Sequence, residues 1–174
     1  ISKSITIGIF FCLFACSEQK DHLNLKDGAH ISLIGNNLCS RMMNFGHFET
    51  ETHYRFPDKN LTIRNLCDGG DTPGFRPHSG RNDPWAFPGA EKFQTKLAQN
   101  SESQGFFERP DEWLTRLKTD VVIAFFGLHD VGKDTAALKS FELELDAFIT
   151  HTLSQKYNGI DTPYLAIVSP IAFQ

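Results

Sequence analysis

The stretch Ile31-Ser32-Leu33-Ile34-Gly35-Asn36-Asn37-Leu38 is a short apolar run that ends in a glycine turn. Three similar runs follow it, over Leu61–Cys67, Val121–Gly127 and Tyr164–Pro170, and all four are nearly continuous rather than alternating in polarity. A continuous apolar run predicts a strand that is buried on both faces of its sheet. The four runs therefore predict a sheet that helices cover on both sides.

Helical patterns separate these runs. Over Asp134–Tyr157 the apolar residues recur at helical spacing (Phe141, Leu145, Phe148, Ile149 and Leu153). Asp134 can serve as the N-cap of this helix. We also expect shorter helices over Leu38–Asn44, Glu91–Asn100 and Asp111–Lys118, the last with Pro110 at its start. Strands that alternate with helices predict an α/β fold, a three-layer α/β/α sandwich around a flavodoxin-like, mostly parallel sheet.

Such a sheet normally has about five strands, and four are found here. We therefore expect the domain, over residues 30–174, to be C-terminally incomplete, and the chain to be a fragment whose sheet and further domains continue past Gln174.

Composition narrows the class of protein. The 174 residues and the 40% hydrophobic content suit one packed domain. The net charge of −4, from 17 basic and 21 acidic residues with no basic run, excludes the electrostatic footprint of nucleic-acid binding. The seven histidines are scattered and no Cys-x-x-Cys occurs, so we expect neither a metal site nor a cofactor.

The first residues do not fit a folded domain. Lys3 precedes an apolar run over Ile5–Ala15 that is too short to span a bilayer but matches the core of a secretion signal. The run ends Leu13-Phe14-Ala15-Cys16, which resembles the cleavage site of bacterial lipoproteins. That resemblance implies a signal peptide over residues 1–15, a lipid on Cys16, a polar tether over 16–29 and an exported protein held at a membrane, in the periplasm or at the cell surface.

In an open parallel sheet, ligands bind beyond the carboxyl ends of the strands. Three unusual turns occupy these places: Gly35-Asn36-Asn37-Leu38, Asn65-Leu66-Cys67-Asp68-Gly69-Gly70-Asp71-Thr72, and Gly127-Leu128-His129-Asp130. In order and position they resemble the first three blocks of the SGNH (GDSL-like) hydrolases, a family of esterases. The resemblance implies hydrolysis of ester bonds, carbohydrate O-acyl groups among them, with an Asp-x-x-His block that lies outside this chain.

The same resemblance gives the catalytic positions. Asn37 stands at the position of the nucleophile, and Gly70 and His129 stand at the positions of the oxyanion donors. Gly35, Asn36, Asp71 and Asp130 stand around the substrate. An amide nitrogen cannot be activated by a histidine base as a hydroxyl is, so serine-type catalysis at Asn37 is excluded. His129 replaces an asparagine, and its imidazole N–H can still donate to an oxyanion.

The sequence leaves open what position 37 does. We favour a helix cap at Asn36-Asn37, with Asn37 as the cap, because asparagine is a preferred N-cap. A replacement nucleophile, Cys39 or Ser40, is an alternative, since a helix N-terminus favours a thiolate. Strands 1 and 2 are neighbours in flavodoxin-like order, so we predict instead that Cys39 and Cys67 form a disulfide across the mouth of the site.

A long loop over residues 68–88 carries side chains that suit a ligand. Trp85 can stack on a sugar ring, and Arg76 and Arg81 can bind carboxylates or hydroxyls. Alternatively, the aromatic residues only pin the loop to the core. Three functions therefore remain: an ester hydrolase acting on a small-molecule or carbohydrate ester, a non-catalytic binding module of a larger exported protein, and a flavin- or phosphate-binding module, which the first turn fits least.

Overall fold

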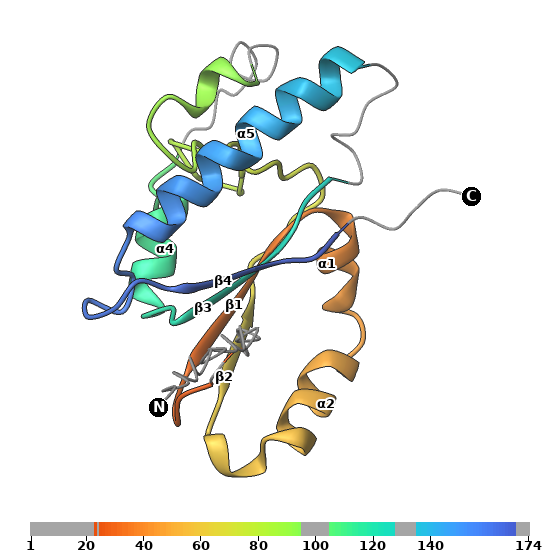
Figure 1. The fold of residues 1–174 in the computed structure, drawn as a ribbon, viewed down its shortest axis with the longest axis vertical. Helices are drawn as coiled ribbons and strands as arrows, with labels where there is room; N and C mark the ends of the chain where they lie inside the picture. Colours follow the sequence, from red (N-terminus) through yellow and green to blue (C-terminus); the bar gives the residue numbers. More distant parts are fainter. Residues whose placement is uncertain (1–22, 24, 95–104, 128–134, 170–174) are drawn as a thin grey trace, which may run out of the picture.

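The computed structural model describes residues 23, 25–94, 105–127 and 135–169. Four parallel strands form one sheet in the order β2-β1-β3-β4 (Figure 1). They are β1 (His30–Gly35), β2 (Thr62–Asn65), β3 (Val121–Phe125) and β4 (Tyr164–Ile167). Each lies within one residue of the predicted start, and the sheet is entirely parallel. Asn65 at the end of β2 pairs with Leu33 of β1, and Phe125 at the end of β3 pairs with Gly35, so the three strands end on the same side of the sheet.

Helices cover both faces of the sheet. On one face, α1 (Asn37–Met42) and α2 (His47–Arg55) pack over Ile31 and Leu33 of β1. On the other face, α4 (Pro110–Arg116) and α5 (Thr135–Ser154) pack over Ile34 and its neighbours on β3. Successive side chains of a strand point to opposite faces, so β1 supplies both hydrophobic cores. The predicted α/β class, with a parallel sheet between layers of helices, is confirmed.

The helices differ from the prediction in two places. Over Glu91–Asn100 the described part forms only a 3-10 turn, Ala90–Lys92, and residues 95–100 lie outside the described residues. Helix α2, with the 3-10 turn Pro57–Lys59 after it, was not predicted. None of the residues of α2 is buried, so it has no apolar stripe that would reveal it. The predicted cap of α5, Asp134, lies outside the described residues.

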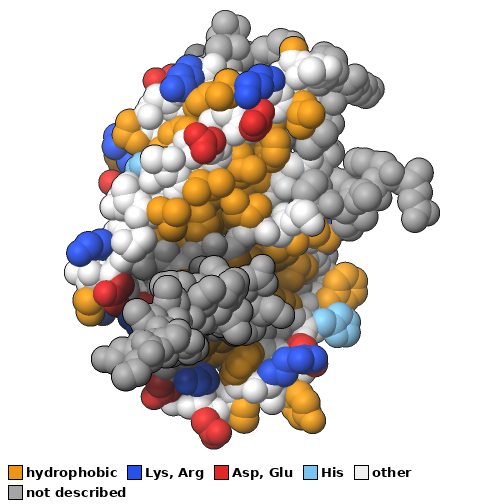
Figure 2. Space-filling model, viewed as in Figure 1, with side chains coloured by type: hydrophobic (Ala, Val, Ile, Leu, Met, Phe, Trp, Pro, Cys, Tyr) orange, Lys and Arg blue, Asp and Glu red, His pale blue; other side chains and the backbone are white. Residues whose placement is uncertain are grey.

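Strand β4 is not buried on both faces, contrary to its continuous apolar run. It lies at the edge of the sheet, where Tyr164 is 48% exposed and Ile167 is 42% exposed. Hydrophobic side chains also gather over α5 in the space-filling view (Figure 2), and Leu138, Leu143 and Leu153 of that helix are exposed. An apolar run therefore predicted the strand correctly but not its position in the sheet.

Candidate functional site

Gly35 is the last residue of β1, at the end of the sheet where β2 and β3 also end. Its φ is +135°, and a Cβ at this position would collide with the carbonyl oxygen of Phe125 on β3. Only glycine permits this approach of two backbones. The N–H of Asn36 donates to the same Phe125 oxygen (3.0 Å), and the N–H of Asp68, after β2, donates to the Gly35 oxygen (3.1 Å). The turn after β1 is thus fixed to both neighbouring strands.

The side chain of Asn36 joins the first turn to the second. Its Oδ1 accepts from the N–H of Asn37 (2.5 Å) and from the N–H of Gly70 (3.4 Å), and its Nδ2 donates to the carbonyl of Asp71 (2.9 Å). The residue is 2% exposed. Two backbone N–H groups therefore converge on one oxygen, which is the arrangement that stabilises an oxyanion in acyl transfer. Here the oxygen belongs to the protein's own amide.

The N-cap of α1 is Asn36. An asparagine cap was predicted correctly, but it lies one residue earlier than the predicted Asn37. Asn37 is the first helical residue and is half-buried. Its side chain lies against the glycine turn: a Cβ on Gly69 would stand 2.8 Å from Asn37 Oδ1. Gly69 therefore leaves room for the Asn37 amide, which would have to shift if this residue carried a side chain.

The predicted disulfide between Cys39 and Cys67 is confirmed, with the two Cα atoms 5.7 Å apart. Asn65, at the end of β2, supports it by donating from Nδ2 to the Cys39 carbonyl (2.9 Å) and accepting from the Cys67 N–H (3.0 Å). A disulfide sulfur is not a free thiolate, so the alternative of Cys39 as a nucleophile is wrong. Ser40 lies three residues beyond Asn37, roughly 4.5 Å farther along the helix axis.

A buried carboxylate that sequence reasoning missed holds the long loop after β2. Glu144 of α5 is 1% exposed. Its Oε1 accepts from Thr72 Oγ1 (2.7 Å) and from the N–H of Gly74 (2.9 Å), and its Oε2 accepts from Gln94 Nε2 (2.8 Å). A signal existed in the sequence: Glu144 stands within the apolar stripe of α5, four residues before Phe148, where a charged residue needs buried partners.

Asp71, Arg76 and Arg81 lie together inside this loop, with 2%, 5% and 2% exposure. Burial raises the pKa of the Asp71 carboxyl to about 8, although the charge of Arg76 acts in the opposite direction. Burial also lowers the pKa of Arg76, and burial together with repulsion from Arg76 lowers the pKa of Arg81 to about 10. The structure thus gathers three predicted ligand-binding residues in the interior, and their role in binding a substrate stays a prediction.

Trp85 pins the loop at its other end. Its ring packs against Phe75, with the ring centres 5.0 Å apart, and the two residues form an isolated β-bridge. The neighbouring Phe87 is 6% exposed and belongs to the core on the α5 face. Phe87 therefore pins the loop to the core, as the alternative interpretation predicted. Trp85 is only half-buried, so part of its ring remains exposed to solvent.

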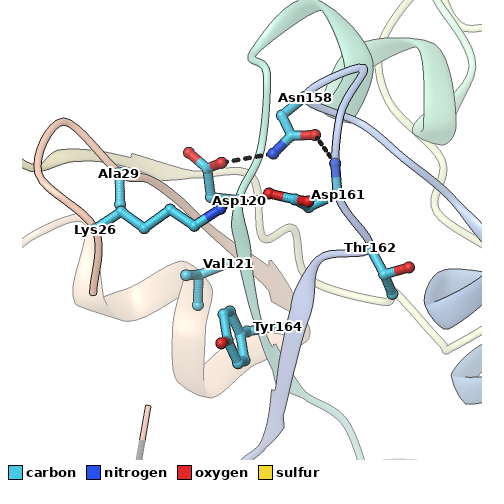
Figure 3. Close-up of a pocket in the computed structure, with 8 residues that line it drawn as sticks. All are labelled: Lys26, Ala29, Asp120, Val121, Asn158, Asp161, Thr162 and Tyr164. Atoms are coloured by element: carbon cyan, nitrogen blue, oxygen red, sulfur yellow. Dashed lines mark hydrogen bonds and ion pairs between the residues drawn. The ribbon is translucent and has the colours of Figure 1, made fainter. Parts of the chain in front are cut away.

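A polar cavity of about 290 Å³ lies at the opposite end of the strands (Figure 3). Its side chains bind one another: Lys26 pairs with Asp161 (2.5 Å), Asp120 accepts from Asn158 Nδ2 (2.8 Å), and Asn158 Oδ1 accepts from the Asp161 N–H (2.9 Å). These contacts join the segment before β1 to the loop before β4. The cavity is therefore not part of the strand-end site, and its charged and amide side chains bind one another.

Three predicted residues, His129, Asp130 and Cys16, lie outside the described residues, whereas Gly127 is buried just after β3. Across the described ranges no group of three or more His, Cys, Asp or Glu is placed to hold a metal ion. None of the helices in these ranges is long and apolar enough to cross a membrane.

Comparisons of the chain with family models, with curated proteins and with solved structures find no match.

Proposed function

We propose that this chain is an SGNH-like ester hydrolase domain in which serine-type catalysis is impaired at Asn37. The order of the three strand-end turns supports the family, because the turns after β1 and β2 meet through the side chains of Asn36 and Asn37. The observation that carries the impairment is the oxygen of Asn36. It accepts the N–H groups of both Asn37 and Gly70, which would otherwise point at the oxyanion of a bound ester.

Serine-type hydrolysis needs both a nucleophile and donors aimed at the developing charge. Position 37 offers an amide, whose nitrogen lone pair is delocalised, and Cys39 is held in a disulfide. Removing a single oxyanion donor typically costs about 100-fold to 1,000-fold in kcat. With a serine absent from position 37 and two donors engaged internally, any ester hydrolysis that remains depends on another nucleophile or on a directly activated water.

The same contacts favour a second candidate, a non-catalytic module that binds a carbohydrate or a similar small ligand. The N–H groups of Asn37 and Gly70 are already hydrogen-bonded within the protein. The two turns can therefore line a binding site without taking part in a reaction. In this proposal the module belongs to a larger exported protein, anchored to a membrane by a lipid on Cys16. The Cys39–Cys67 disulfide supports export, because disulfides persist in oxidising compartments.

Hydrolysis of p-nitrophenyl acetate by the full-length protein tests the proposal. The wild type and Asn37→Ala should hydrolyse the ester at the same rate as buffer, whereas Asn37→Ser should be faster, with thermal melts to show that all three are folded. Turnover by the wild type that survives Asn37→Ala contradicts the impairment, because another group then attacks the ester. If neither Asn37→Ser nor Asn36→Gly with Asn37→Ser, which also frees the two N–H groups, gains activity, the site is not of the SGNH type, and a glycan array becomes the test of the binding module.

A further inference from the structure

The polar cavity of Figure 3 has the size of a small-molecule site and lies where the strands begin. Its volume of about 290 Å³ is close to the lower end of the range for ligand pockets. Lys26 and Ala29 precede β1, Asp120 and Val121 stand at the start of β3, and Tyr164 is the first residue of β4. Binding in this cavity is therefore independent of the esterase site proposed at the other ends of the strands.

Hydrogen bonds to Asp120 and Asn158 hold the polar wall of the cavity in place. Asp120 Oδ2 accepts from the His30 N–H (2.9 Å), and its Oδ1 accepts from Asn158 Nδ2 (2.8 Å). Asn158 Oδ1 in turn accepts from the N–H groups of Ile160 (2.8 Å) and Asp161 (2.9 Å), which fixes the loop before β4. A wall that is already ordered loses little conformational entropy when a ligand binds to it.

Polar groups of this lining keep hydrogen-bonding capacity for a ligand. Within the described ranges, the hydroxyls of Thr162 and Tyr164 have no hydrogen-bond partner. A carboxylate can accept about four hydrogen bonds, and Asp161 accepts from Lys26 through Oδ2 alone. The Lys26 ammonium has three N–H groups, of which one donates to Asp161. The cavity thus offers donors and acceptors side by side.

The charges of the lining favour a neutral ligand. Lys26 carries one positive charge, and Asp120 and Asp161 carry two negative ones, so the net charge is −1. This balance disfavours phosphates and carboxylates. A cationic ligand would compete for Asp161 with Lys26, which already pairs with it (2.5 Å).

The lower side of the cavity in Figure 3 is apolar and aromatic. Tyr164 and Val121 lie below the Lys26–Asp161 pair in this view, whereas Asn158 lies above it. Tyr164 is 48% exposed, so its ring is accessible to a ligand. An aromatic ring offers a large apolar contact area at a small cost in conformational entropy.

A sugar ring has the same division of surfaces, because its C–H groups form apolar faces and its hydroxyls, which both donate and accept, surround the rim. We propose that this cavity binds one neutral monosaccharide unit. The sugar packs on Tyr164, donates to Asp120 and Asp161, and exchanges hydrogen bonds with Thr162 and Lys26.

Titration of the ¹⁵N-labelled full chain with neutral sugars, followed by NMR, tests the proposal. The probes are D-glucose, D-galactose, D-mannose and N-acetyl-D-glucosamine, each up to about 50 mM, because an open site for one sugar unit should bind with a Kd of roughly 1–10 mM. At least one of them should shift the amide signals of Lys26, Val121 and Tyr164 saturably. D-glucuronate and D-galacturonate, which add a carboxylate to the ring, should bind more weakly.

Two variants remove lining groups without breaking a hydrogen bond between described residues. Thr162→Val and Tyr164→Leu should each weaken sugar binding about fivefold. The matched controls are Thr50→Val and Tyr54→Leu on α2, which contributes no residue to the lining, and they should bind like the wild type.

The proposal is overturned if no neutral sugar gives a saturable shift, if the uronates bind as tightly, or if both lining variants bind like the wild type. Shifts confined to Gly70 and Asp71 also overturn it, because the sugar would then bind at the strand-end turns. Since the titration uses the wild-type chain, it decides the matter even if a variant does not fold.

Discussion

Glu144 offers the clearest test of what holds the long loop over the site. Replacing it with alanine removes the acceptor for three hydrogen bonds, from Thr72, Gly74 and Gln94. The Thr72 hydroxyl and the Gly74 N–H are buried, and each then lacks a partner, at about 1–3 kcal/mol apiece. Gln94 is half-buried and can turn to water. The expected loss in the free energy of unfolding is about 4 kcal/mol.

For a domain of this size, that loss lowers Tm by roughly 8–16 °C. Equilibrium denaturation in urea measures the free energy, and hydrogen exchange at Gly74 shows whether the loop opens locally. Glu144→Gln keeps one acceptor oxygen and should lose less than half as much. The matched control is Glu142→Ala, two residues away on α5, whose ion pair with Lys139 is exposed and whose loss should cost less than about 0.5 kcal/mol. A loss below about 1 kcal/mol in Glu144→Ala would refute the reasoning.

Three further predictions concern the same edge of the sheet. Reducing or replacing the Cys39–Cys67 disulfide, which closes 28 residues, should lower the free energy of unfolding by about 3–4 kcal/mol, measured by denaturation with and without reductant. Because the pKa of Asp71 rises from 3.8 to about 8 on folding, the folded state holds one extra proton between these values. Stability should therefore fall as pH rises from 4 to 8, by at most about 1.4 kcal/mol per pH unit, and Asp71→Asn should flatten this slope in denaturation curves. Gly35→Ala should cost roughly 2 kcal/mol or more in the same assay, because its Cβ would strike the backbone of β3.

The regular elements could be predicted because each depends on a repeating local pattern. The apolar runs of β1 and β3 and the stripe of α5 are long enough to be distinct. The disulfide followed from the order of two neighbouring strands, which brings the turns after them together. These inferences need only periodicity and the rules of parallel sheets.

The remaining features depend on contacts between distant segments. Nothing in the local sequence shows that the Asn36 oxygen accepts from Gly70, 34 residues later, or that Glu144 binds Thr72. Either of the two consecutive asparagines could cap the helix. Asn36 takes the role because its side chain also bonds Gly70 and Asp71 of the second turn. Sequence can indicate which residue types gather at the strand ends, but their hydrogen-bond partners come from the tertiary structure.

Labelling by a fluorophosphonate tests the central claim most directly, because the probe reacts only with an activated nucleophile. An attacking oxygen forms a bond to phosphorus as fluoride leaves, which adds one phosphonyl group to the intact mass. The wild type should remain unlabelled, and Asn37→Ser should gain a single adduct on residue 37. A stoichiometric adduct on the wild-type protein, at any residue of this edge, would contradict an impaired serine-type site.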